Sequence, residues 1–126
     1  NGIAGARITV GVLGITFKEN CPDIRNSKVA DLVKELRSWN VTVVVTDPWA
    51  DAAEVRDEYG IELGQITPET PVDSLIVAVG HQQYRELSPA ALRALCTSHH
   101  QPVLGDLKSL FDRHDAARQG FSVFRL

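Results

Sequence analysis

A polar loop at residues 14–27 carries most of the side chains that could do chemistry. Its sequence is Gly-Ile-Thr-Phe-Lys-Glu-Asn-Cys-Pro-Asp-Ile-Arg-Asn-Ser, and it lies between the apolar run 8–13 and a helix-like run 28–38. Open α/β sheets hold nucleotide phosphates where a strand leads through a glycine-containing loop into the start of a helix. With the fixed cation of Lys18 in this loop, we expect the chain to bind a nucleotide or a nucleotide-sugar. The alternative is that Lys18 is a solvated loop lysine.

Within this loop, Asp23 and Arg25 are spaced to project to the same side of an extended segment. We expect them to pair with each other and hold the loop in shape. An exposed ion pair adds little stability, so a positional role is the better interpretation. Asn26 and Ser27 are expected to satisfy free backbone N–H groups at the start of the following helix.

Other polar residues follow the later apolar runs, at positions that should share one edge of a parallel sheet. Asp47 follows the run 41–46, and it either binds a ribose or forms a turn with Pro48. His81 follows the run 75–79, and it makes either a functional contact or a structural hydrogen bond. Asp106 is expected to cap or brace its own loop.

The glycines and histidines argue against two other kinds of site. Gly11 and Gly14 do not complete a Gly-x-Gly-x-x-Gly fingerprint, so a self-contained NAD-binding domain is not encoded. No two histidines have a His-x-x-x-His spacing and no cysteine lies near them in sequence, so we expect no metal site. The histidines are His81, His99, His100 and His114.

Composition indicates one compact domain over residues 1–126, with 44% hydrophobic and 23% charged residues. The net charge is -3 and both signs are interspersed, so we expect no nucleic acid and no membrane partner. Cys21 and Cys96 form no Cys-x-x-Cys pair, which favours a reduced, cytoplasmic setting. The chain begins without Met and contains none, so we expect a piece of a longer polypeptide.

Apolar runs rich in Val and Ile alternate with segments of helical period, which predicts an α/β fold. The segment 61–71 is ambiguous and has room for a short edge strand. The architecture expected is a small doubly wound, Rossmann-like parallel sheet with helices on both faces. Strands are predicted at 8–13, 41–46, 75–79, 103–107 and 121–126, and helices at 27–38, 50–59, 88–95 and 110–119.

The segment 14–28 resembles the signature of the C-terminal domain of the UDP-glucose/GDP-mannose dehydrogenase family. It is most similar to the branch that oxidises UDP-N-acetylhexosamines for capsule, O-antigen or Vi-type polysaccharides. The likeness covers nearly all 126 residues. It includes the segment 3–13, which resembles the family's entry strand, the Asp47-Pro48 turn, the strand-to-histidine segment 77–81 and the end of the final strand at 106–108.

This resemblance also implies what the chain lacks. Whole enzymes of the family have an N-terminal NAD domain, a central helix for dimerisation and a nucleophilic cysteine that acts during two hydride transfers. None of these parts matches this chain, and Cys21 is not the family nucleophile. The resemblance therefore implies a fragment that is inactive alone, with NAD bound by the absent N-terminal domain. Its partners would be the other domains of a parent enzyme that is a homodimer or larger.

By the same resemblance, the domain closes over the UDP part of a UDP-sugar substrate. Phe17 and Lys18 match the residues that touch the nucleotide-sugar, although Phe17 could equally be a core residue that anchors the loop. Lys108 stands where relatives often have Arg, and it keeps the charge but loses the bidentate geometry. The function expected is that of the UDP-sugar-binding domain of an NAD-dependent nucleotide-sugar 6-dehydrogenase. The alternative is a non-catalytic module for oligomerisation or regulation, favoured if Lys18 and Lys108 point away from each other.

Overall fold

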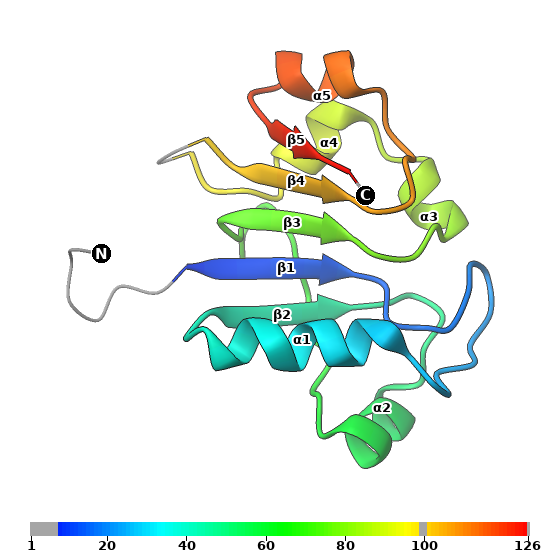
Figure 1. The fold of residues 1–126 in the computed structure, drawn as a ribbon. Coiled ribbons are helices and arrows are strands. Elements are labelled where there is room, and N and C mark those ends of the chain that lie inside the picture. Colours follow the sequence, from blue (N-terminus) through cyan, green and yellow to red (C-terminus); the bar gives the residue numbers. More distant parts are fainter. Residues whose placement is uncertain (1–7, 99–100, 126) are drawn as a thin grey trace.

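The computed structural model describes residues 8–98 and 101–125, which form a twisted parallel sheet with flanking helices (Figure 1). In this part of the chain the sheet has five strands in the order β2-β1-β3-β4-β5. The elements are β1 (Thr9–Leu13), α1 (Lys28–Ser38), β2 (Thr42–Thr46), α2 (Ala52–Tyr59), β3 (Ser74–Val77), α3 (Gln82–Arg85), α4 (Pro89–Arg93), β4 (Val103–Asp106), α5 (Arg113–Arg118) and β5 (Ser122–Phe124).

The order of the strands determines where a ligand can bind. From β1 the chain runs outward to β2, and it then crosses back over β1 to form β3 on the other side. Every neighbouring pair is parallel, and Leu13 at the end of β1 lies beside Thr46 of β2 and Val77 of β3. Loops that leave β1 and β3 therefore diverge at a topological switch point, where doubly wound folds bind ligands.

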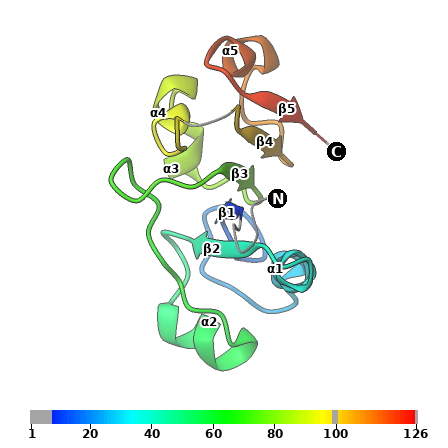
Figure 2. The ribbon, with the colours of Figure 1, turned by 90° about the vertical axis from the view of Figure 1, so that its left-hand side faces the viewer.

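Helices lie on both sides of this sheet. Figure 2 shows α1 on one face, with α3 and α4 on the opposite face. One cluster of buried side chains includes Val12, Val33, Val43, Val45 and Val55. Another includes Leu75, Val77, Leu92, Leu104 and Phe121. The predicted small doubly wound parallel sheet is confirmed.

Polar side chains determine where the helices begin. Ser27, Asp51, Ser88 and Asp112 each accept a hydrogen bond from a backbone N–H three residues later, which is the usual N-cap arrangement. Gly60 ends α2 in the left-handed conformation, as expected from its position. Across the described ranges no helix is long and apolar enough to cross a membrane, and α1 has only 11 residues.

The structure differs from the sequence-based expectation in several connections. The helix expected from residue 110 begins at Arg113, because Asp112 is extended and acts as the N-cap, with its side chain accepting from the N–H of Asp115. The segment 61–71 contributes only isolated bridges, including one between Leu63 and Val45 of β2. The short helix α3 was not predicted, since four residues carry too little periodicity to be recognised.

Candidate functional site

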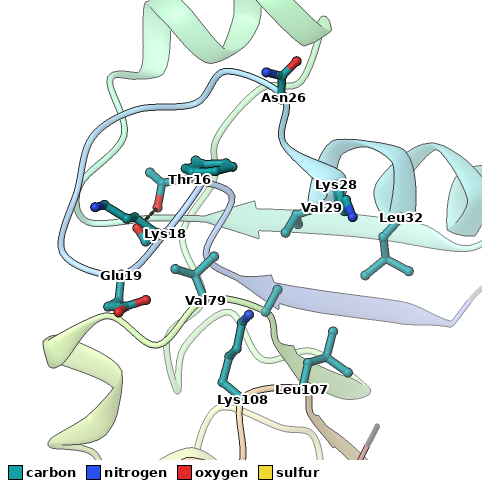
Figure 3. Close-up of a pocket in the computed structure, with 12 residues that line it drawn as sticks. Thr16, Lys18, Glu19, Asn26, Lys28, Val29, Leu32, Val79, Leu107 and Lys108 are labelled. Carbon is teal, nitrogen blue, oxygen red and sulfur yellow. Dashed lines mark hydrogen bonds between the residues drawn. The ribbon is translucent and has the colours of Figure 1, made fainter.

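A cavity of about 470 Å³ opens at the carboxyl ends of β1, β3 and β4, beside the start of α1 (Figure 3). This is the place that the strand order indicates for a ligand. Its wall is apolar where α1 faces the exits of β3 and β4, and polar along the loop after β1. The lining residues are Thr16, Phe17, Lys18, Glu19, Asn26, Lys28, Val29, Leu32, Ala78, Val79, Leu107 and Lys108.

Three lysines stand among the described lining residues, and all three are exposed: Lys18, Lys28 and Lys108. Figure 3 shows Lys108 extending toward the cavity, whereas the side chain of Lys18 extends away from Lys108. The two ammonium groups therefore do not converge, although both residues line the same cavity. Lys28 was not predicted as a site residue, because in the sequence it is simply the first residue of a helix.

The ring of Phe17 lies at the surface, with 62% of the residue exposed. The alternative that Phe17 is a core residue is therefore wrong. Its backbone N–H donates to the carbonyl of Asp23 at 2.7 Å, which closes the loop on itself. An exposed aromatic ring at the edge of a cavity is available to cover an apolar or aromatic part of a ligand.

The expected pair of Asp23 and Arg25 is present. Arg25 donates from Nε and Nη2 to the two carboxylate oxygens of Asp23, at 3.0 and 2.9 Å. These hydrogen bonds lower the pKa of Asp23 to about 2. The pair lies in a second, more open depression of about 750 Å³ between the loop and α2. The pair lines a different pocket from the three lysines, and its role in shaping the loop stays a prediction.

Ser27 connects the end of the loop to its beginning. Its hydroxyl donates to the carbonyl of Ile15 at 2.7 Å and accepts from the N–H of Ala30 at 3.3 Å. Its own N–H donates to the Tyr59 hydroxyl at 3.1 Å, and that hydroxyl donates to the carbonyl of Ile24. The helix cap thus also brings the two ends of the loop together. Asn26 lines the cavity with a positive φ of 55°.

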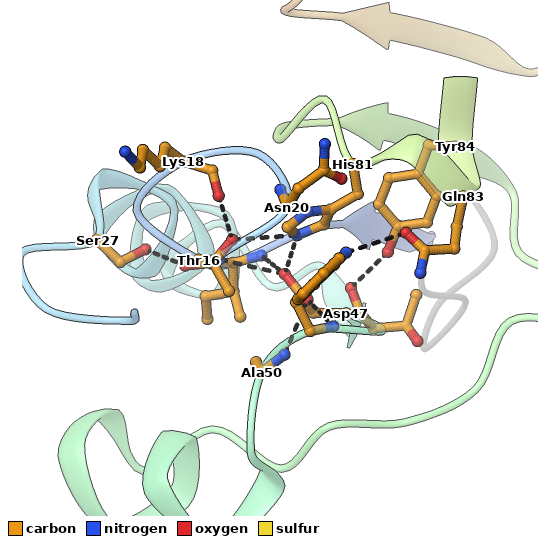
Figure 4. A network of polar contacts seen from close by, with 12 residues as sticks. Thr16, Lys18, Asn20, Ser27, Asp47, Ala50, His81, Gln83 and Tyr84 are labelled. Atoms are coloured by element: carbon orange, nitrogen blue, oxygen red, sulfur yellow. Dashed lines mark hydrogen bonds and ion pairs between the residues drawn. The ribbon is translucent and has the colours of Figure 1, made fainter. Parts of the chain in front are cut away.

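A buried polar network lies behind the cavity, centred on Asp47 (Figure 4). Oδ2 of Asp47 accepts from the N–H groups of Ile15 at 2.7 Å and Thr16 at 3.2 Å, and from Nε2 of His81 at 2.9 Å. Oδ1 accepts from the N–H groups of Trp49 at 2.7 Å and Ala50 at 3.0 Å. The carboxylate therefore joins the loop after β1 to the exits of β2 and β3.

These contacts determine the charge of Asp47. Burial alone raises the pKa of a carboxyl group, but the hydrogen bonds from His81, Ile15 and Trp49 outweigh burial and hold the pKa of Asp47 below its ordinary value. The carboxylate is thus ionised and internally satisfied. The alternative of ribose binding is wrong for this residue, and the turn at Asp47-Pro48 is the correct interpretation.

His81 is completely buried and has a defined tautomer. The backbone N–H of Asn20 donates to Nδ1 at 2.9 Å, so Nδ1 carries no proton. The ring proton is therefore on Nε2, which faces Asp47 Oδ2 and, at 3.1 Å, Thr16 Oγ1. The indole ring of Trp49 stacks on the imidazole. Of the two alternatives for His81, the structural hydrogen bond is the one observed.

Asp106 braces its loop, as expected. Its carboxylate oxygens accept from the N–H groups of Leu110 at 3.0 Å and Phe111 at 2.9 Å. Ser109, between them, has a positive φ of 54°. The tight turn that results carries Lys108 at the cavity edge.

The two glycines near the first strand serve the packing of this domain. A Cβ atom on Gly11 would lie 2.6 Å from Ile66 Cδ1, and one on Gly14 would lie 2.6 Å from Val79 Cβ. At both positions a neighbouring side chain therefore packs where any larger residue would place its Cβ atom. Within residues 8–98 and 101–125, no three His, Cys, Asp or Glu side chains gather to hold a metal ion. His99 and His100 lie outside the described residues.

The two cysteines are expected to differ in reactivity. Cys96 is buried, and burial raises its pKa to about 11, whereas Cys21 is only half-buried. Because the thiolate is the reactive form, iodoacetamide should label Cys21 at least roughly tenfold faster than Cys96 in the folded protein. Mass spectrometry of timed samples measures both rates, and urea-unfolded protein is the control. Equal rates in the folded protein would contradict the burial of Cys96.

Comparison with known proteins gives a consistent assignment. The family model for the UDP-glucose/GDP-mannose dehydrogenase family, UDP binding domain, matches residues 11–113. The UDP-N-acetyl-D-glucosamine 6-dehydrogenase of Salmonella typhi is 48% identical over 100 residues, covering 79% of this chain and 23% of that protein. The Pseudomonas aeruginosa enzyme of the same name is 42% identical over 110 residues, covering 87% and 25%.

A solved structure shows the same fold. The NDP-N-acetyl-D-galactosaminuronic acid dehydrogenase of Methanosarcina mazei Go1 superposes with a TM-score of 0.81 at 21% identity, covering 94% of this chain and 24% of that one. The chain thus spans about a quarter of the length of these relatives. The resemblance first seen in the segment 14–28 is confirmed, and the chain belongs to the UDP-glucose/GDP-mannose dehydrogenase family as its UDP binding domain.

Proposed function

We propose that the cavity at the ends of β1, β3 and β4 binds the UDP part of a UDP-sugar, with Phe17, Lys18 and Lys108 as contact residues. The observation that carries this proposal is the position of the cavity. It lies at the topological switch point of a domain whose family model is named for UDP binding. Its mixed lining suits such a ligand, because the lysines attract a diphosphate and the apolar wall accepts a base or sugar face.

Each contact residue has a distinct part in this proposal. Lys108 supplies a charge that already extends toward the cavity, and Lys18 needs only rotation of an exposed side chain to do the same. Phe17 offers its exposed ring at the entrance. Asp23, Arg25 and Ser27 keep the loop in shape, through the ion pair and the helix cap described above.

At the level of the whole protein, we propose that the chain is part of an NAD-dependent 6-dehydrogenase that converts the C6 alcohol of a UDP-sugar to a carboxylate. The relatives at 42–48% identity act on UDP-N-acetyl-D-glucosamine by name, which supports a UDP-N-acetylhexosamine and a role in polysaccharide biosynthesis. NAD would be held by another domain of a cytoplasmic, homodimeric or larger enzyme. Binding energy from UDP in this domain would then place the sugar at the reacting groups.

Calorimetric titration with UDP tests the proposed site. We expect Lys18→Ala to weaken UDP binding about tenfold, since a charge-assisted hydrogen bond to phosphate is lost. Lys34→Ala is the matched control. Lys34 is an exposed lysine of α1 and is not among the residues that line the cavity. Equal losses in the two variants, or none in Lys18→Ala, would contradict the role of Lys18. GDP and NAD serve as competing nucleotides.

A second candidate is a non-catalytic module for oligomerisation or regulation. The observation that favours it is the direction of Lys18, which extends away from Lys108. Large apolar side chains at the surface, such as Trp39 at 64% and Phe124 at 50% exposure, would serve such a module. Self-association measured by sedimentation, combined with no heat of UDP binding at millimolar concentration, would favour this candidate over the first.

A further inference from the structure

His81 joins segments that belong to different parts of the sheet, and it does so next to the loop that carries Phe17 and Lys18. We propose that His81 is a positioning residue: as a neutral, Nε2-protonated imidazole it anchors residues 16–20 and thereby sets the affinity for UDP. This inference rests on the proposed function, and it adds a buried residue that makes no contact with the cavity itself.

The imidazole ring of His81 forms hydrogen bonds with two different segments. Nε2 faces Asp47 Oδ2 at 2.9 Å, which ties His81 to the exit of β2. Nδ1 accepts from the N–H of Asn20 at 2.9 Å, which ties it to the loop after β1. The side chain has no exposed surface, so water does not compete for either bond. A single rigid ring therefore fixes the distance between the loop and the sheet.

Lys18 lies between two residues that are held in place, Thr16 and Asn20. The hydroxyl of Thr16 donates to the carbonyl of Lys18 at 3.0 Å, and the same hydroxyl faces His81 Nε2. On the other side of Lys18, Asn20 binds His81 through its N–H and accepts from the N–H of Gln82 through its side chain at 2.8 Å. The backbone at Lys18 is thus held while its side chain stays free, so less conformational freedom must be lost when a ligand binds.

Positioning of the loop by His81 is distinct from stabilisation of the polar network. Asp47 keeps four backbone N–H donors without His81, so the brace at the centre of the network survives removal of the imidazole. The contact that His81 itself provides to the loop is the acceptor at Nδ1. If Nδ1 is lost, the N–H of Asn20 has no acceptor on residue 81, and the tip of the loop is no longer held.

The surroundings suit a proton on Nε2, because two oxygen atoms lie within hydrogen-bond distance of that nitrogen. The groups that face His81 are the carboxylate of Asp47, the hydroxyl of Thr16, and the rings of Trp49 and Tyr84. Burial, and then the charge of Asp47, raise the pKa of the Tyr84 phenol, so Tyr84 stays protonated and donates to the carbonyl of Thr46. A proton on Nδ1 would point at the N–H of Asn20, so the anchor requires the tautomer with its proton on Nε2.

Two variants divide the two functions of the ring. His81→Gln places an amide nitrogen near the Nε2 position and keeps the donor to Asp47, but it removes the acceptor for Asn20. His81→Asn places an amide oxygen near the Nδ1 position and keeps that acceptor, but it removes the donor. We expect His81→Gln to bind UDP about tenfold more weakly than the natural chain, and His81→Asn to retain at least about threefold more affinity than His81→Gln. His114→Gln, at an exposed histidine of α5, is the control.

Amide hydrogen exchange at Asn20 is the second readout, and it needs no ligand. We expect faster exchange in His81→Gln but not in His81→Asn or His114→Gln. If UDP binds His81→Gln as tightly as the natural chain, the positioning role is overturned while the proposed function stands. If the natural chain binds no UDP although the Asn20 amide depends on His81, the proposed function fails and the anchor remains.

A measurement on the natural chain keeps the inference testable if either variant does not fold. Long-range ¹⁵N–¹H spectra of the histidine rings distinguish a protonated Nε2 from a protonated Nδ1. We expect the Nε2–H form for His81 at neutral pH, with Nδ1 unprotonated. A proton on Nδ1 at that pH would overturn the inference, because the Asn20 N–H would then have no acceptor there.

Discussion

Asp47→Asn is expected to destabilise the domain by about 3–5 kcal/mol and to lower its unfolding temperature by roughly 10–20 °C. Five N–H groups of the described residues donate to this buried carboxylate. An amide offers one oxygen, so its NH₂ group would face at least two of these donors whichever way it is turned. Buried donors without an acceptor are costly, and here they lie in the connections after both β1 and β2. Thermal and urea unfolding measure the effect.

Asp51→Asn is the matched control for this change. Asp51 is an exposed N-cap whose carboxylate accepts one hydrogen bond, from the N–H of Glu54, and asparagine caps helices about as well as aspartate. We expect a change within about 0.5 kcal/mol. A loss at Asp47→Asn no larger than that of this control would contradict the network described above.

The same carboxylate gives a pH dependence with a defined sign. The pKa of Asp47 is lower in the folded protein than its ordinary value of 3.8, so its contribution to stability is complete above that value. The contribution is lost as the pH falls through the folded pKa. The stability gap between the natural chain and Asp47→Asn should therefore be constant near neutral pH and narrow below about pH 4.

Gly14→Ala is expected to cost about 3–5 kcal/mol in the free energy of unfolding. Gly14 has a φ of 101°, which residues with a side chain rarely adopt. A Cβ atom there would also lie 2.6 Å from Val79 Cβ and 3.1 Å from the Val79 backbone nitrogen. Because Val79 lines the cavity, the repacking would displace the cavity wall as well as destabilise the fold. Urea unfolding followed by circular dichroism measures the change.

Gly60→Ala separates the two causes. Gly60 also has a positive φ, of 68°, but nothing lies within 4 Å of a Cβ atom placed on it. It therefore carries backbone strain without a steric clash, and we expect a loss of about 1 kcal/mol. Similar losses at Gly14 and Gly60 would show that contact with Val79 contributes nothing.

Much of the fold could be predicted from the sequence because the signals are local. Continuous Val-rich runs such as 41–46 predict parallel strands buried on both faces, and β2 lies inside that run. Ser27 and Gly60 mark the ends of helices through chemistry that acts over three or four residues. The parallel order then follows from alternation of strands and helices.

The boundaries that were missed depend on distant contacts. Asp106 holds residues 106–111 in a turn through the N–H groups of Leu110 and Phe111, and a carboxylate four or five residues upstream is not a recognised turn signal. Leu63 pairs with β2 over one position only, which a hydrophobic pattern cannot distinguish from a strand.

The candidate site was predicted in part for the same reason. Loop residues such as Lys18 belong to one contiguous signature, and they do line the cavity. The contact between Asp47 and His81 joins residues 34 positions apart, and only the parallel order of β1, β2 and β3 brings them together. Because both residues follow parallel strands, the sequence places them at the same edge of the sheet. The hydrogen bonds that bury them became clear only from the structure.

We propose that UDP binds at the ends of β1, β3 and β4, and amide NMR of the ¹⁵N-labelled chain during a UDP titration locates the binding site. We expect chemical-shift changes around the cavity of Figure 3, at residues 16–19, 26–32, 78–79 and 107–108. Changes confined to residues 21–25 and 54–58, which line the second depression, would contradict it. The absence of any change at millimolar UDP would contradict it as well.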